Sequence, residues 1–160
     1  MRIDELTTEA EWREAFPVMR EVRTHLDEET FLDLMWKMRP EGYRLLAARD
    51  DQGVIRALAG IATLTNLYYG RHIWVYELIT TASERSRGYG KALLDYVDAL
   101  ARDLSCDTVA LASGLQRADA HRFYEQKMGM RRTAYTFQKA IRPSIFTWRA
   151  VLPAPPSDEG

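Results

Sequence analysis

A glycine turn between a strand-like run and an amphipathic helix constrains this chain more than any other feature. Residues 85–94 read Arg-Ser-Arg-Gly-Tyr-Gly-Lys-Ala-Leu-Leu, and the run rich in strand formers that precedes them is Ile73–Thr81. The first N–H groups of a helix have no partner within it, and the helix dipole adds partial positive charge there. Gly88 and Gly90 allow an anion to approach the backbone closely. The turn is therefore typical of a site for a phosphorylated ligand.

Two common phosphate-binding motifs do not fit this turn. The dinucleotide fingerprint requires a third small residue, and Leu93 stands at that position. A Walker A loop requires Ser or Thr after Lys91, but Ala92 follows it, and Arg85 stands where the first glycine belongs. The pattern that does fit is Arg-x-x-Gly-x-Gly.

Periodicity along the chain predicts a mixed α/β domain over residues 1–142, followed by a partly disordered tail over 143–160. The expected order is strand, two helices, three strands, helix, strand, helix, strand. The strands are expected at 2–6, 43–48, 54–67, 73–80, 107–111 and 131–140. The helices are expected at 8–22, from the N-cap Asp27 to Pro40, from the glycine turn to Leu104, and at 118–128.

Composition excludes several classes of protein. A net charge of −1 gives no global attraction to nucleic acid or to anionic membranes. No apolar run approaches the roughly 20 residues that span a bilayer, and no signal peptide is visible. Cys106 is the single cysteine, which suits a reducing cytoplasm. No cluster of Cys, His, Asp and Glu has the spacing of metal ligands, so no metal is expected.

Three segments in this order resemble the GNAT family of N-acetyltransferases, in particular its small bacterial members. They are Glu77-Leu78-Ile79-Thr80, Arg85–Leu94 and Ala120-His121-Arg122-Phe123-Tyr124-Glu125 with Gly129-Met130. The resemblance implies the acyl-CoA N-acyltransferase fold, a mostly antiparallel central sheet with helices on both faces. It also implies that acetyl-CoA donates an acetyl group to a primary amine of a small molecule or protein, by direct attack in a ternary complex. Pairing into a homodimer is implied in the same way.

The resemblance assigns acetyl-CoA contacts residue by residue, through the strand and through the pyrophosphate loop. They are Leu78, Ile79, Thr80, Arg85, Ser86, Arg87, Gly88, Tyr89, Gly90 and Lys91. Two positions depart from the family pattern: Ser86 replaces a frequent glycine, and Arg117 stands where an asparagine is frequent. A role for that asparagine does not carry over.

Acetyl transfer to an amine requires a base and a group that assists the departing thiolate. An alkyl amine with a pKa near ~10.4 is mostly protonated at pH 7, a penalty of about 4.6 kcal/mol. Glu77 is the expected base, directly or through a water chain; the structural alternative is that Glu77 pairs with an arginine or faces water where the strands splay apart. Tyr124 is expected to hydrogen-bond the thiolate, with a place in the core as its alternative. For His121, a structural role is expected over a catalytic one.

Two functions compete with the enzyme. One is a non-catalytic acyl-CoA-binding regulatory module, and the other is a structural interaction protein in which the glycine loop is incidental. The presence of both Glu77 and Tyr124 favours catalysis. The acceptor amine is left open by the sequence, because acceptor pockets are built from variable loops.

Overall fold

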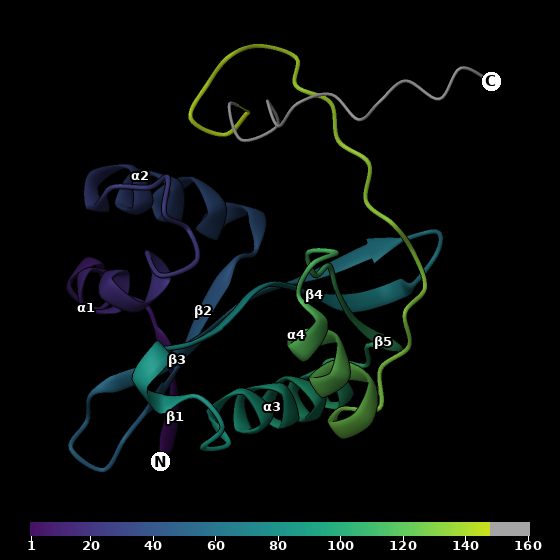
Figure 1. The fold of residues 1–160 in the computed structure, drawn as a ribbon, viewed down its shortest axis with the longest axis horizontal. Coiled ribbons are helices and arrows are strands. Elements are labelled where there is room, and N and C mark those ends of the chain that lie inside the picture. Colours follow the sequence, from purple (N-terminus) through teal and green to yellow (C-terminus); the bar gives the residue numbers. More distant parts are fainter. Residues whose placement is uncertain (148–160) are drawn as a thin grey trace.

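A sheet of five strands with helices on both faces is the frame of the computed structural model, which describes residues 1–147 (Figure 1). In spatial order the strands are β1 (Arg2–Leu6), β2 (Arg44–Arg49), β3 (Ile55–Asn66), β4 (Gly70–Thr80) and β5 (Thr108–Leu111). Strands β1 to β4 pair antiparallel, and β5 pairs parallel with β4. The predicted mixed, mostly antiparallel fold is therefore confirmed.

Two layers of helices sandwich this sheet. The helices are α1 (Glu9–Met19), α2 (Glu28–Met38), α3 (Tyr89–Asp103) and α4 (Ala118–Arg122), and α4 continues as the π-helix η3 (Phe123–Lys127). Two short 3₁₀ turns are η1 (Arg39–Glu41) and η2 (Ala82–Glu84). One buried cluster joins the sheet to α1 and α2, and a second joins it to α3 and η3. Figure 1 shows α1 and α2 on one side of the strands and α3 and α4 on the other.

Side-chain caps fix where α1 and α2 begin. The Thr8 side chain accepts a hydrogen bond from the Glu11 N–H, and the Glu11 carboxylate accepts one from the Thr8 N–H, which makes a capping box. Asp27 accepts from the Thr30 N–H at 2.8 Å, so the predicted N-cap of α2 is confirmed.

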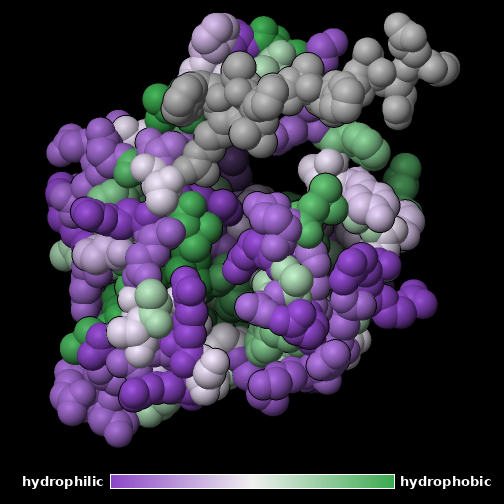
Figure 2. Space-filling model, viewed as in Figure 1, coloured by the Kyte–Doolittle hydropathy of each residue, from purple (hydrophilic) through white to green (hydrophobic). Residues whose placement is uncertain are grey.

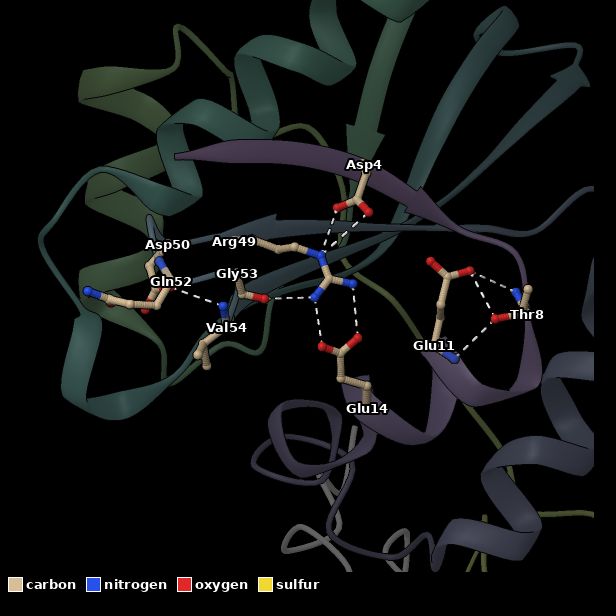
Figure 3. A network of polar contacts seen from close by, with 9 residues as sticks. All are labelled: Asp4, Thr8, Glu11, Glu14, Arg49, Asp50, Gln52, Gly53 and Val54. Carbon is tan, nitrogen blue, oxygen red and sulfur yellow. Dashed lines mark hydrogen bonds and ion pairs between the residues drawn. The ribbon is translucent and has the colours of Figure 1, made fainter.

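Arg49 ties the first half of the fold together (Figure 3). Its guanidinium donates two hydrogen bonds to the Glu14 carboxylate, at 2.7 and 2.9 Å, two to the Asp4 carboxylate, at 3.2 and 3.5 Å, and one to the Gly53 carbonyl at 2.9 Å. These partners lie on α1, on β1 and in the turn between β2 and β3. Because Arg49 is itself buried, the paired carboxylates are what make its charge tolerable there.

The prediction of a strand at 131–140 is wrong. These ten residues are extended but belong to no strand, and every one of them is exposed. The pattern of strand formers is present, but a strand exists only where a neighbour accepts its hydrogen bonds, and the chain turns away from β5 after Met130 (Figure 1). Most of the tail predicted at 143–160 lies outside the described residues, which end at 147.

No helix of the described residues is long and apolar enough to span a membrane. The loop between β3 and β4 is only residues 67–69, because β3 runs to Asn66 and β4 begins at Gly70, three residues before the predicted strand 73–80. The Asn66 side chain accepts hydrogen bonds from the N–H groups of Tyr68 and Tyr69, and so closes this hairpin.

Replacing Arg49 with Met is expected to destabilise the protein by about 1–3 kcal/mol, since two carboxylates then lose their partner at a partly buried site. The hydrogen bond from Arg49 lowers the pKa of Glu14 below its ordinary 4.5. Glu14 therefore stabilises the fold above that pH, and this contribution is lost as the pH falls through the lowered pKa. Urea unfolding at pH 7 and pH 3 should show a smaller gap between R49M and wild type at pH 3; an equal gap contradicts the role of Glu14.

Candidate functional site

The glycine turn is an exposed loop whose backbone is bent to present the start of α3. Gly88 is the N-cap of α3 and has a φ of 87°, a left-handed conformation that favours glycine. Ser86 also lies in this region, with a φ of 66°. A glycine would take up this conformation without strain, which gives a physical reason for the frequent glycine at this position. A methyl group added to Gly88 would meet no atom within 4 Å, so open space lies over the helix N-terminus.

The predicted contact residues of this loop do not all face the same way. Tyr89 is buried in the core cluster beneath α3, so its side chain is mostly withdrawn from the turn. Arg87 pairs with Glu84 at 3.3 Å and Lys91 pairs with Asp95 at 2.6 Å. Arg85 is exposed and has no ion-pair partner among the described residues. Two paired cations and one unpaired cation therefore surround the opening of α3.

A carboxylate from the α1 side holds the beginning of the loop. Glu21 accepts hydrogen bonds from the Thr81 hydroxyl at 2.6 Å and from the Ala82 N–H at 3.0 Å. The Thr81 N–H in turn donates to the Arg56 carbonyl at 2.9 Å. The chain between β4 and α3 is thus fixed at its first residues, and its glycine-rich part is left accessible.

A β-bulge in β4 decides which side chains reach the site. Gly60 of β3 lies opposite Glu77, whereas the next residue, Ile61, lies opposite Val75, so Tyr76 is an extra residue in β4. Side chains alternate along a strand, and one extra residue reverses the faces that follow. Ile73 and Val75 therefore pack toward α3, whereas Glu77 and Ile79 point to the α1–α2 side.

The second half of β4 has a free edge. The pairing with β5 ends at Val75 opposite Leu111, and residues 77–80 pair only with β3 among the described strands. Their other edge has no neighbouring strand, so an extended ligand could pair with it; the acetyl-CoA contacts expected for Leu78, Ile79 and Thr80 stay a prediction. Just beyond β5, the hydroxyl of Ser113 is buried without a hydrogen-bond partner in the described part of the chain. Sequence reasoning did not single out this serine.

Glu77 lies in a small polar cluster inside an apolar surrounding. Its Oε2 accepts a hydrogen bond from the Tyr43 hydroxyl at 2.5 Å, and its Oε1 lies 3.3 Å from Nη2 of Arg23. The structural alternative weighed for Glu77, pairing with an arginine, is thus present. Burial, followed by the charge of Glu77, raises the pKa of Tyr43 well above its usual value, so Tyr43 stays a hydrogen-bond donor.

Gly60 makes room for this cluster. A methyl group at Gly60 would lie 2.0 Å from the Tyr43 hydroxyl and 2.1 Å from Glu77 Oε2, so any side chain there would displace the pair. A glycine inside a predicted strand is a signal for a bulge or for close approach. That signal was available in the sequence, whereas the partners Tyr43 and Arg23 were not, because they come from other elements.

Beside this cluster, between α2 and β4, lies a hollow of about 260 Å³. Its walls are apolar apart from Arg23, His25, Tyr43 and Glu77, and they are formed by Met19, Leu26, Phe31, Leu34, Met35, Met38 and Phe146. In Figure 2, hydrophobic residues (green) lie near the centre of the face shown, with hydrophilic residues (purple) on both sides of them. The hollow can hold a small molecule that is mainly apolar.

Tyr124 occupies the opposite side of β4. It lies on the π-helix η3 and is 8% exposed within the cluster beneath α3. Burial raises the pKa of its phenol, so the hydroxyl keeps its proton at neutral pH. The Tyr124 carbonyl accepts a hydrogen bond from the Met130 N–H at 3.0 Å, which closes the helix at Gly129. π-turns inside helices are frequent at functional sites.

The three motif segments meet at Gly90. A methyl group there would lie 3.7 Å from Cζ of Phe123 and 3.8 Å from Oγ1 of Thr80. The loop, the end of β4 and the helix that carries Tyr124 are thus neighbours in space. Glu77 and Tyr124 flank the free edge of β4 from its two faces, Glu77 from the α1–α2 side and Tyr124 from the α3 side.

Of the three histidines, His25 lines the hollow, whereas His121 and His72 are hydrogen-bonded to backbone carbonyls. His121 hydrogen-bonds the Gly114 carbonyl at 2.9 Å, which agrees with the structural role expected for it. His72 is buried and hydrogen-bonds the Gly70 carbonyl. In residues 1–147 no group of three or more Cys, His, Asp and Glu side chains is placed to hold a metal ion.

Comparison with known proteins agrees with this geometry. Residues 6–130 match the model of the acetyltransferase (GNAT) family. The chain is 44% identical over 142 residues to the uncharacterized N-acetyltransferase YhdJ of Bacillus subtilis, covering 88% of this chain and 99% of that protein.

Solved structures share the fold at lower identity. An aminoglycoside antibiotic 6'-N-acetyltransferase from Acinetobacter haemolyticus superposes with a TM-score of 0.75 at 16% identity, covering 90% of this chain and 100% of the other. A protein described as a transcriptional regulator from Bacillus halodurans gives a TM-score of 0.76 at 19% identity, covering 87% and 98%. From the family match and the bacterial relative, the chain belongs to the GNAT family and is an N-acetyltransferase.

Proposed function

We propose that acetyl-CoA binds across the glycine loop and the free edge of β4, and that its acetyl group passes to a primary amine in a ternary complex. The convergence of the loop, the end of β4 and the Tyr124 helix at Gly90 carries this proposal. The pyrophosphate would accept hydrogen bonds from the backbone of residues 86–91, with Arg85, Arg87 and Lys91 around it. The pantetheine would pair with the backbone of Leu78, Ile79 and Thr80.

In the reaction, the neutral amine attacks the thioester carbonyl carbon, the C–S bond breaks, and an amide and the CoA thiol result. Glu77 is proposed to take the amine's proton, directly or through water, since it faces the hollow from which an acceptor would come. Tyr124 is proposed to donate a hydrogen bond to the sulfur as negative charge develops there. Its raised pKa favours this role, because the phenol remains a donor at neutral pH.

The acceptor is proposed to be an amine with an apolar substituent. The hollow beside Glu77 is lined mostly by aliphatic, methionine and phenylalanine side chains, and the opposite charges of Arg23 and Glu77 compensate each other in an ion pair. A polycationic amine entering the hollow would meet a single carboxylate, Glu77, which is already paired with Arg23. It would also lose hydrating water against the apolar walls. We further propose that the domain spans residues 1–142 and that the protein works in the cytoplasm, which its single cysteine suits. The homodimer is proposed because the resemblance to the family implies it.

A Gly88→Val substitution should weaken acetyl-CoA binding at least tenfold. The side chain would occupy the open space over the helix N-terminus and would also disfavour the left-handed backbone. Calorimetric titration with acetyl-CoA measures the effect. Gly53→Val is the matched control, because Gly53 also has a positive φ and open space around it but lies in the β2–β3 turn. Equal affinities of G88V and G53V would place the cofactor elsewhere.

A Tyr124→Phe substitution should lower kcat about 10²-fold and leave the affinity for acetyl-CoA nearly unchanged, because only the hydrogen bond to the leaving sulfur is lost. Release of free thiol with a saturating amine measures kcat. Tyr96→Phe removes the hydroxyl of an exposed tyrosine on α3 and should change nothing. A Y124F enzyme with normal turnover would remove Tyr124 from the chemistry.

The acceptor class can be tested with an amine panel. We expect 2-phenylethylamine and hexylamine to have higher kcat/KM than spermidine or kanamycin. Leu34→Glu adds a carboxylate to a half-buried wall of the hollow and should shift the preference toward the cations, whereas Leu34→Gln should not. A wild-type preference for spermidine or kanamycin would contradict the apolar acceptor while leaving the acetyl transfer itself intact.

A further inference from the structure

The hollow beside β4 is apolar on most sides but carries one pair of opposite charges. Glu77 and Arg23 both line it, and Oε1 of Glu77 lies 3.3 Å from Nη2 of Arg23. Their side chains are 11% and 34% exposed, so the pair is largely withdrawn from bulk water. Among the described residues, no other Asp, Glu, Lys or Arg lines the hollow. A small molecule that enters it therefore meets a carboxylate and a guanidinium side by side.

Both members of this pair keep hydrogen-bonding capacity. Within residues 1–147, Arg23 uses Nε and Nη2 to contact Glu77 and the Tyr76 carbonyl, which leaves the N–H groups of Nη1 for a ligand. On Glu77, Oε1 faces Arg23 and Oε2 accepts from the Tyr43 hydroxyl at 2.5 Å. A carboxylate offers about four lone-pair sites, so Glu77 can accept a further hydrogen bond from an amine.

One class of amine would use both partners. An amine or ammonium group donates to a carboxylate, and a carboxylate accepts from a guanidinium, often through two parallel hydrogen bonds. An alkylamine would place its nitrogen near Glu77 and offer no anion to Arg23. An α-amino acid carries an amine and a carboxylate on the same carbon atom, so it can face Glu77 and Arg23 at once.

The remaining walls restrict the side chain of such an amino acid. They are mainly apolar, and they include Leu26, Phe31, Leu34, Met35 and Met38. A polar side chain would lose its hydration against them without gaining hydrogen bonds. The volume of about 260 Å³ lies just below the roughly 300–1,000 Å³ of sites for drug-sized ligands. It therefore suits a single amino acid such as leucine, methionine or phenylalanine.

We propose that the acceptor is a free α-amino acid with an apolar side chain, bound through its carboxylate to Arg23 and presenting its amine to Glu77. This inference rests on the proposed acetyl transfer and names its substrate class. The amine nitrogen bonds to the acetyl carbon, and the C–S bond breaks. The amine's proton leaves through Glu77 and is finally taken up by the CoA thiolate. The products are an N-acetylamino acid and the CoA thiol, and Arg23 is the residue that selects the acceptor.

The first test compares amines that differ only in the carboxylate. L-phenylalanine and 2-phenylethylamine share the amine and the ring, and release of free thiol from acetyl-CoA measures kcat/KM for each. We expect the value for L-phenylalanine to be at least tenfold higher, because a hydrogen bond between charged groups is gained. L-phenylalaninamide, which resembles the N-terminus of a protein and has no carboxylate, should behave like 2-phenylethylamine.

The second test assigns this preference to Arg23. Arg23→Gln should bring the ratio of kcat/KM for L-phenylalanine over 2-phenylethylamine close to one. Arg23→Lys keeps the charge but cannot form two parallel hydrogen bonds, so it should give an intermediate ratio. Arg20→Gln is the matched control, because Arg20 is exposed at the end of α1 and does not line the hollow. Since each ratio compares two substrates of one variant, a general loss of stability does not alter it.

The outcomes separate this inference from the proposed function. A wild-type ratio near one, a ratio that R23Q and R23K leave unchanged, or a preference for L-phenylalaninamide would overturn the amino acid acceptor. Acetylation of 2-phenylethylamine in the same assays would still support the proposed transfer. If acetyl-CoA binds but no amine releases thiol, both proposals fail together.

Discussion

The extra residue in β4 is the feature on which the site depends. Without Tyr76 as a bulge, Glu77 would follow Ile73 and Val75 into the core beneath α3, where its charge would have no partner. The bulge turns Glu77 toward Tyr43 and Arg23 instead. It also lies where the pairing with β5 ends, so one local irregularity both redirects a carboxylate and opens a backbone edge.

Much of this architecture could be predicted because it is local. The start of α2 at Asp27 and the helix after Gly88 follow from capping and periodicity, and both were predicted correctly. Three short motifs identified the family, and the family in turn predicts that the Tyr124 segment and the glycine loop belong to one site. The roles of Glu77, Tyr124 and the loop residues in binding and catalysis remain predictions.

What could not be predicted depends on contacts between distant elements. Nothing in the sequence around Glu77 names Tyr43 or Arg23 as its partners, since they lie 34 and 54 residues away. The segment at 131–140 failed for a related reason. Its residue types favour a strand, but whether it becomes one depends on a hydrogen-bonding neighbour, and sequence preference carries no information about that neighbour.

Glu21 gives the site a mechanical property. Glu21 lies just after α1 and two residues before Arg23, which lines the hollow. Its carboxylate accepts hydrogen bonds from Thr81 and Ala82 at the beginning of the glycine loop. The glycine loop and the wall of the hollow are therefore anchored to one short piece of backbone. A ligand that fills the hollow and shifts residues 21–23 would also shift the glycine loop. The affinities for the ligand in the hollow and for the ligand on the loop would then be coupled, by the same factor in either order of binding.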